Sequence, residues 1–480
     1  MQYKWTALSV TTVGVLITGI DSRILIVGLP TIAQQLHASA AEAIWITQSY
    51  LLASTIGLLL IGRISDLFGR IKIYNLGFVV FTLGSALCSL SGSAAQLILF
   101  RVVQGIGAGM IAANSAAVIT DASPKNELGT MLGINHTAIR LGNIAGFTIS
   151  GVILSLVDWR GLFYINIPIG IFGTIWAYVR LREIAVKDPV KKIDWTGFAL
   201  FSIGLTLILV GITFLSYGFS GIEAGLFLVL FGGILMVVFI RTESRSFFPL
   251  LDLRLFKIRL FAMGNLAQLL NSLSWYAVLL LMAFYLQIGL NYSPLQAGVG
   301  ILPVELTYLV VALVCGKLSD KYGTRILTTL GLSTNTIGFI YISTFGATTQ
   351  YWQVALSLVI IGIGNGMFTA PNISAVMGSV PQNRVGIASA FRQTMFNVGL
   401  TTSYGLAILF LTLGISYQSL SSLLQSASNL PGSSVLRSEF LDGFRIAVFL
   451  LMLIDAAAII PSAMRGSKTK YEEPVAETES

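Results

Sequence analysis

Long apolar runs alternate with short polar segments along almost the whole chain. A helix needs about 20 predominantly apolar residues to cross the hydrocarbon core of a bilayer, and most of the runs reach that length. Because the polar segments between them are mostly short, consecutive runs are expected to form antiparallel neighbouring helices. The pattern predicts fourteen helices, at residues 7–30, 44–62, 73–92, 95–120, 129–156, 161–180, 195–217, 223–240, 260–288, 297–316, 326–346, 351–378, 385–414 and 443–463.

Composition supports this picture of a chain that lies in lipid. Of the 480 residues, 55% are hydrophobic and 10% are charged, whereas a soluble domain has about 25% charged residues. The first apolar run contains Asp21 and Arg23 and is long for a signal sequence, so we expect a retained helix and not a cleaved leader. Cys88 and Cys315 both lie in apolar runs, which argues against a disulfide framework.

The basic residues indicate how the predicted helices are oriented. If the N-terminus is cytoplasmic, 22 of the 29 Lys and Arg residues fall in cytoplasmic segments and 3 fall in external ones. Cytoplasmic loops of membrane proteins carry an excess of Lys and Arg, and one helix missed in the middle would destroy this asymmetry. We therefore expect a multi-pass protein of the cell membrane with both termini cytoplasmic. The other four basic residues fall inside helices: Arg23, Arg101, Arg140 and Arg392.

Two sets of motifs recur at nearly one spacing. Residues 62–69 are similar to residues 316–323, with an offset of 254, and residues 105–110 are similar to residues 362–367, with an offset of 257. With these offsets, the second predicted helix corresponds to the tenth, so each motif recurs eight helices later in the chain. The predicted organisation is a six-helix half at 1–180, two inserted helices with cytoplasmic linkers at 181–259, a second six-helix half at 260–466, and a disordered cytoplasmic tail at 467–480.

Several motifs resemble the major facilitator superfamily, and in particular its fourteen-helix drug:proton antiporter branch. The resemblance covers nearly the whole chain and implies two parallel halves with a substrate site between them near the midplane. The helix 5 signature of antiporters is altered, because Phe147 and Ser150 stand where a Pro and a Gly are usual, and this weakens the inference to antiport. The motifs that carry the resemblance lie at 62–72, 101–107, 21–30, 159–170, 194–197 and 249–253.

Three charged residues inside predicted helices are candidates for proton coupling: Asp21, Arg101 and Glu305. An ionised side chain in the bilayer is costly, so such residues usually face the bundle interior and have a function. Asp21 could instead form a static pair with Arg23 or another buried Arg, although residues two apart, such as 21 and 23, point to nearly opposite helix faces. Arg101 could instead reach a membrane boundary. Asp455 is expected to be peripheral, because the resemblance places the last helix at the periphery.

The recurring loop motif predicts a cytoplasmic gate. Carboxylates near helix N-termini and cations near C-termini each contribute about 0.3–1 kcal/mol, which suits a latch that opens in every cycle. The alternative, solvated basic residues of the cytoplasmic face, accounts for Lys321 but not for two carboxylates at equivalent positions. The gate residues are Gly62, Asp66, Gly69 and Arg70 in the first copy and Gly316, Asp320, Gly323 and Arg325 in the second.

Further polar residues at membrane depth are candidates for the substrate cavity: Arg23, His136, Arg140, Arg392 and Gln393. His136 precedes Arg140 by one turn and shares its face. The alternatives are a buried core histidine and a structural Arg–Gln pair. Glycines on two helices are expected to allow close helix packing, namely Gly105 and Gly109, and Gly142, Gly146 and Gly151.

The favoured function is proton-coupled efflux of lipophilic or amphipathic small molecules by alternating access, with proton-coupled symport or exchange of a small anionic metabolite as the alternative. Enzyme and receptor functions are disfavoured, because the chain has two His residues and no phosphate-binding Gly-x-x-x-x-Gly-Lys loop. We expect no cofactor and no metal. The net charge is +8, but the sequence has no basic patch that would bind nucleic acid. The expected partners are therefore the substrate, protons and the lipid bilayer, and the protein is expected to function as a monomer.

Overall fold

The computed structural model describes residues 3–124, 127–184, 194–246, 251, 253–381, 385–425 and 433–466, and within these ranges it contains helices and connections but no β-strand. The predicted all-helical fold class is confirmed. The helices are α1 (Tyr3–Gln35), α2 (Ala40–Phe68), α3 (Arg70–Ser89), α4 (Ala94–Ala122), α5 (Leu128–Leu156), α6 (Gly161–Tyr164), α7 (Asn166–Arg180), α8 (Trp195–Leu215), η1 (Gly218–Ser220), α9 (Ile222–Arg245), η2 (Leu253–Lys257), α10 (Arg259–Phe284), η3 (Tyr285–Gly289), α11 (Pro294–Tyr322), α12 (Thr324–Ile342), α13 (Tyr351–Met377), α14 (Val385–Leu411), α15 (Tyr417–Gln425) and α16 (Ser433–Met464).

Each of the fourteen predicted runs coincides with a helix, but the number of membrane spans is smaller. Among the described residues, 12 helices are long and apolar enough to cross a membrane. Helix α2 would make 13 if its segments Ala40–Leu58 and Leu60–Phe68, which meet at 49°, form one span. Helix α12 is absent from this set, since its sequence contains many Thr, Ser and Asn residues. Fourteen spans are therefore not confirmed.

The helices pack in two groups and a pair. Helices α1 to α5 and α7 pack together, α10 to α14 and α16 form the second group, and α8 and α9 pack on each other and reach the groups through α2 and α14. Along the pseudo-repeat, α1, α3, α4 and α7 correspond to α10, α12, α13 and α16. The proposed tail at 467–480 lies outside the described residues, and the domain bounds stay a prediction.

The glycines expected to allow close packing lie where two helices approach each other. A Cβ atom added to Gly105 would lie 2.4 Å from the carbonyl oxygen of Tyr50 on α2, and one added to Gly142 would lie 2.5 Å from that of Leu16 on α1. Such distances leave no room for a side chain. Close backbone neighbours of this kind also surround Gly109, Gly146 and Gly151.

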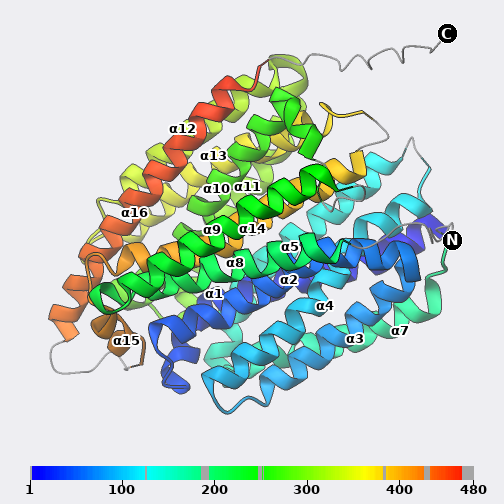
Figure 1. Ribbon diagram of the computed structural model, residues 1–480. Helices are drawn as coiled ribbons and strands as arrows, with labels where there is room; N and C mark the ends of the chain where they lie inside the picture. Colours follow the sequence, from blue (N-terminus) through cyan, green and yellow to red (C-terminus); the bar gives the residue numbers. More distant parts are fainter. Residues whose placement is uncertain are drawn as a thin grey trace, which may run out of the picture.

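Helix α1 begins and helix α16 ends at the same end of the bundle, which we call the terminus end (Figure 1). The opposite, far end carries the α1–α2 connection and α15. There Gln287 Nε2 donates to the Val27 carbonyl over 3.1 Å, and Gln425 Nε2 donates to the His37 carbonyl over 3.1 Å. The two helix groups are therefore joined at the far end.

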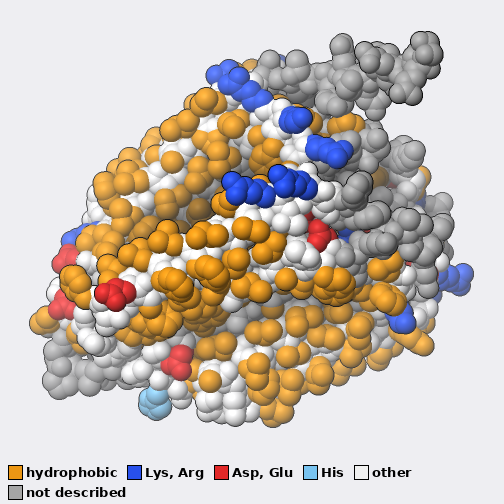
Figure 2. Space-filling view, in the orientation of Figure 1, with side chains coloured by type: hydrophobic (Ala, Val, Ile, Leu, Met, Phe, Trp, Pro, Cys, Tyr) orange, Lys and Arg blue, Asp and Glu red, His pale blue; other side chains and the backbone are white. Residues whose placement is uncertain are grey.

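The surface agrees with a protein that spans a bilayer. Figure 2 shows apolar side chains over the long sides of the helices, with most visible Lys and Arg side chains gathered toward the terminus end. Basic residues mark the cytoplasmic side of membrane proteins. This distribution supports the same orientation as the sequence, with the terminus end in the cytoplasm.

Candidate transport site

Asp21 and Arg101 form a fully buried ion pair between α1 and α4. Arg101 Nη1 lies 2.7 Å from Asp21 Oδ2, and both side chains are at most 1% exposed. The guanidinium also donates from Nε to the Ile46 carbonyl over 3.2 Å and lies 4.0 Å from the centre of the Tyr50 ring. Arg101 therefore does not reach a membrane boundary, and the partner of Asp21 is Arg101, not Arg23.

The other carboxylate oxygen of Asp21 is held by two amides that the sequence did not single out for chemistry. Oδ1 accepts hydrogen bonds from Gln104 Nε2 over 2.9 Å and from Asn166 Nδ2 over 2.7 Å. Gln104 also donates to Ser85 Oγ over 2.6 Å. Both amides lie within motifs that carried the family resemblance. A polar residue within an apolar helix was the sequence feature that could have identified them as partners of Asp21. Asp21 thus has three nitrogen donors on its two oxygens.

Glu305 meets Arg140 where the two helix groups face each other. Arg140 on α5 donates from Nη2 to Tyr308 Oη on α11 over 2.8 Å, and its guanidinium lies 4.0 Å from the centre of that ring. Its Nη1 is 3.8 Å from Glu305 Oε2. Glu305 is 1% exposed, and neither carboxylate oxygen has a hydrogen-bond partner among the described residues. Its carboxylate is therefore held far more loosely than that of Asp21.

Two further arginines lie in the same region. The Arg23 guanidinium is 4.6 Å from the centre of the Tyr276 ring, and it is close enough to Glu305 and Arg140 to interact electrostatically. Arg392 donates to its neighbour Gln393 over 3.3 Å. Arg23 and Arg392 are 4% and 7% exposed, and the Nε atom of each lacks a partner among the described residues.

The central cluster, defined as Arg23, His136, Arg140, Glu305 and Arg392, contains four of the five predicted cavity residues. His136 is exposed and interacts electrostatically with Arg140 and Arg392. Gln393, the fifth, flanks the cluster and donates to Asn397 over 3.1 Å. The cluster contains three guanidinium groups and one carboxylate, so it carries net positive charge in the conformation described. An electronegative ligand group would complement it.

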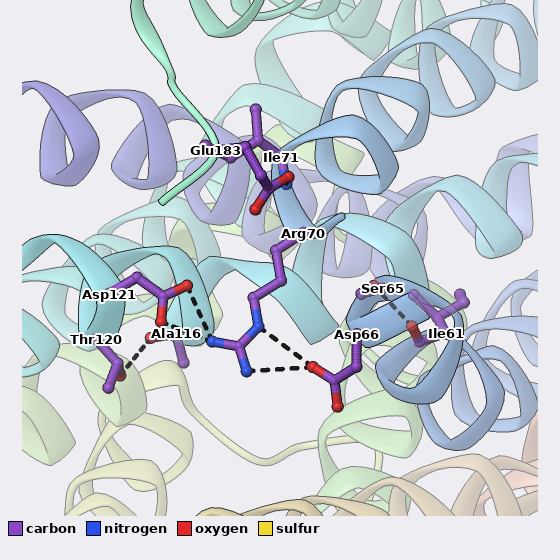
Figure 3. A network of polar contacts seen from close by, with 9 residues as sticks. All are labelled: Ile61, Ser65, Asp66, Arg70, Ile71, Ala116, Thr120, Asp121 and Glu183. Carbon is purple, nitrogen blue, oxygen red and sulfur yellow. Dashed lines mark hydrogen bonds and ion pairs between the residues drawn. The ribbon is translucent and has the colours of Figure 1, made fainter. Parts of the chain in front are cut away.

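The first copy of the gate motif forms a salt-bridge network across three helices (Figure 3). Arg70 at the start of α3 donates from Nη1 to both oxygens of Asp121 on α4, over 2.7 and 2.9 Å. It also donates from Nη2 to Asp66 Oδ1 on α2 over 3.2 Å. Gly69 links α2 to α3 with a φ of 108°, a conformation that favours glycine. The network ties α2, α3 and α4 together at the terminus end.

The second copy repeats the backbone of this motif. Gly323 links α11 to α12 with a φ of 81°, whereas Arg325 is exposed. The side chain of Asp320 lies outside the described part of the chain. A Cβ atom added to Gly62 would meet nothing within 4 Å, and one added to Gly316 would meet only Ala370 Cβ at 3.9 Å. These two glycines therefore make no close helix approach.

Asp455 overturns one expectation. Its side chain is completely buried between α16, α10 and α12, where it contacts Asn271, Ser274 and Thr336. The expectation of a peripheral residue came from the position of the helix, but a peripheral helix still turns one face to its neighbours.

A bundle of long apolar helices in two matched groups, with charged side chains buried between them, is the architecture of a multi-pass membrane transporter. The family model of the Major Facilitator Superfamily matches residues 11–399. The chain belongs to the Major Facilitator Superfamily.

Relatives and solved structures agree with this assignment. The riboflavin transporter RibZ of Clostridioides difficile (strain 630) is 31% identical over 87% of this chain and 90% of its own length. The cephamycin export protein CmcT of Amycolatopsis lactamdurans is 30% identical over 93% and 90%. A solved bacterial homologue of the human lysosomal transporter Spinster, inward-facing and unoccupied, shares the fold with a TM-score of 0.68 and 16% identity over 96% and 97%.

Proposed function

We propose that this protein is a proton-coupled exporter of lipophilic or amphipathic small molecules that works by alternating access. The observation that carries the proposal is the buried Asp21–Arg101 pair, 2.7 Å long, inside the first helix group. An ionisable acid in this setting is costly unless it is paired, and in transporters such acids mark proton or substrate pathways. Relatives named as a cephamycin export protein and as a tetracenomycin C resistance and export protein support the direction of transport.

In this mechanism, the proton competes with Arg101 for Asp21. The ionised carboxylate holds α1 to α4 through Arg101, while Gln104 and Asn166 fix its other oxygen. Protonation would remove the attraction to the guanidinium and free the two helices to shift. Glu305, which lacks hydrogen-bond partners among the described residues, would accept a proton or a cationic substrate group between the helix groups.

The Asp66–Arg70–Asp121 network would act on the conformational equilibrium. It lies at the terminus end, whereas the described contacts Gln287–Val27 and Gln425–His37 join the helix groups at the far end. Part-exposed ion pairs contribute about 0–1 kcal/mol each, so they can break and form in every cycle. We also propose that the protein has fourteen membrane spans, which are the 12 counted above together with α12 and the bent α2. We propose further that both termini are cytoplasmic and that the protein functions as a monomer.

One observation favours a second function, which is proton-coupled symport or exchange of a small anionic metabolite. The central cluster holds three guanidinium groups against one carboxylate, and Arg23 Nε and Arg392 Nε are buried without partners in the described residues. Buried donors of this kind suit an electronegative ligand group. A relative named as a riboflavin transporter is compatible with this reading.

Accumulation in proteoliposomes under an imposed pH gradient separates the two functions. The probes are ethidium, a lipophilic cation, and riboflavin, an aromatic molecule rich in hydrogen-bond acceptors. An exporter should concentrate a probe on the acidic side, in exchange for protons. Accumulation on the alkaline side together with protons would instead identify a symporter, and the absence of any gradient effect would remove proton coupling.

A further inference from the structure

Asp455 is an ionisable side chain that the proposed mechanism does not use. It lies inside the membrane span Val435–Met464 and is 0% exposed. It contacts side chains of α10 and α12, and both helices pack on α16 (Figure 1). Asp21 on α1 is held by side chains of α4 and α7 in the first group. Each half of the fold therefore buries one carboxyl group between its helices.

The two carboxyl groups differ in their counter-charges. Asp21 has Arg101 at 2.7 Å. The charged residues on the helices around Asp455 are few: Arg259 begins α10, Arg325 begins α12, and α13 has none. On α16, Arg445 precedes Asp455 by ten residues, about 15 Å along the axis, and Arg437, Glu439 and Asp442 are farther away. Arg465 follows the end of α16, ten residues after Asp455.

The nearby arginines have other partners. Arg259, at the start of α10, donates to the Met464 carbonyl, and Arg392, on the neighbouring α14, donates to Gln393. The polar groups that contact Asp455 in the described part of the chain are the amides of Asn271 and Asn335 and the hydroxyls of Ser274 and Thr336, which are all neutral. An ionised Asp455 would therefore be a buried charge without a partner, which costs several kcal/mol.

The hydrogen-bond geometry also favours a neutral carboxyl group. Thr336 Oγ1 lies 3.0 Å from Asp455 Oδ2 and 3.0 Å from the Leu332 carbonyl, yet a hydroxyl has one hydrogen to donate. Ser274 Oγ likewise lies 3.2 Å from Asp455 Oδ1 and 3.1 Å from the Asn271 carbonyl. If Oδ2 carries a proton, it donates to Thr336, and Thr336 keeps its bond to the helix carbonyl.

An ionised Asp455 would have little to replace that proton. The Nδ2 atom of Asn271 donates to Asp455 over 3.4 Å, whereas Asp21 receives three nitrogen donors within 2.9 Å. Asn335 is also close to this carboxyl group, but its Nδ2 makes no hydrogen bond of normal geometry among the described residues.

We propose that Asp455 is a second proton-binding site, which holds a proton in the conformation described and exchanges it during transport. The protonated state follows from the missing counter-charge and the hydroxyl geometry alone. Its exchange during the cycle rests on the proposed proton-coupled function. The two halves then bind protons in different ways, one through an ion pair and one through a neutral carboxyl group.

Infrared difference spectroscopy of the purified full chain tests the protonated state. The variants are Asp455→Asn and, as a matched control, Asp158→Asn, whose carboxylate is 44% exposed and already paired with Arg160. At neutral pH, the wild type should show a protonated-carboxyl stretching band that Asp455→Asn lacks and Asp158→Asn keeps. An identical carboxyl band in wild type and Asp455→Asn would overturn the proposal.

Thermal unfolding gives a second readout that does not depend on a spectral assignment. An Asn at 455 can donate to Thr336 and accept from Asn271 as a protonated acid does, so Asp455→Asn should unfold at or above the wild-type temperature at neutral pH. Asp455→Leu, which loses these bonds, should unfold at a lower temperature. Equal destabilisation by Asn and Leu would contradict a protonated Asp455. Stabilisation of the wild type by sodium over choline, lost in Asp455→Asn, would show a sodium site instead.

Transport tests the exchange step separately. In proteoliposomes with ethidium as the probe, Asp455→Asn should lower the number of protons moved per substrate relative to wild type and Asp158→Asn. An unchanged ratio would overturn the exchange while leaving the infrared result standing. A wild type that moves no protons would instead refute the proposed function, and the carboxyl band would still decide whether Asp455 binds a proton.

Discussion

Replacement of Asp21 by Asn should abolish proton-driven accumulation and leave downhill exchange of substrate largely intact. The side-chain size is kept, and the new carbonyl oxygen can still accept from Gln104 and Asn166. The amide nitrogen, however, would face Arg101 Nη1, where an oxygen now lies at 2.7 Å. Without a carboxylate, this position cannot bind and release a proton. The proton gradient can then no longer drive the conformational change.

The structure also gives the size of the stability effect. Loss of one partner of a buried ion pair costs about 3–5 kcal/mol, because the other charge stays buried. Arg101 keeps Gln104 Oε1 at 2.6 Å, the Ile46 carbonyl and the Tyr50 ring, so the loss should lie toward the lower end of that range. The double variant Asp21→Asn/Arg101→Gln removes the stranded charge and should recover most of the stability, but not the accumulation.

Ethidium flux in proteoliposomes with and without a pH gradient provides the assay, together with thermal unfolding of each variant. Asp158→Asn serves as the control, since that exposed carboxylate pairs with Arg160 at the surface. An Asp21→Asn variant that concentrates the probe at the wild-type rate would show that Asp21 is structural. Glu305 would then be the leading proton carrier.

Three other perturbations test separate parts of the account. Asp66→Asn should slow turnover far more than it weakens probe binding, because the carboxylate acts on the conformational equilibrium; lost binding with an unchanged equilibrium would refute the gate. Gly151→Val should open the far end, since a Cβ atom at this position lies 2.6 Å from the Leu295 Cα atom. Distances between spin labels on the α1–α2 connection and on α15 measure this opening. Gly133→Val is the control, because a Cβ atom there meets nothing within 4 Å, and it should leave those distances unchanged. In a background with both natural cysteines replaced by Ser, a Cys at Phe219, which is 97% exposed, should react with an impermeant thiol reagent outside intact cells, and a Cys at Ile184 should not; the reverse result would invert the topology.

Hydropathy was sufficient to place the helices, because a lipid solvent demands long apolar segments with their backbone hydrogen bonds satisfied internally. It failed where the environment is different. Helix α15 is short and amphipathic, and it lies in a connection at the far end, so the sequence has no long apolar run from which it could be predicted. Helix α12 was predicted correctly from the run at 326–346, but its Thr, Ser and Asn residues lower its hydropathy, so it is not counted among the candidate membrane spans.

The charged residues of the site were visible in the sequence, but their partners were not. Asp21 and Arg101 are 80 positions apart, and Arg70 and Asp121 are 51 apart, so no local spacing rule joins them. Asp455 was misjudged for a related reason. The position of a helix at the edge of a fold does not determine which of its faces a residue occupies.

The central claim, proton-coupled antiport, is tested most directly by the sign of the pH change inside proteoliposomes. A pH-sensitive dye in the lumen reports the change when ethidium or riboflavin is added outside and enters down its own gradient. Antiport through Asp21 predicts that protons leave and the lumen becomes more alkaline, with no such change in Asp21→Asn. A lumen that becomes more acidic would show symport, and a lumen pH that stays constant while the probe enters would contradict proton coupling altogether.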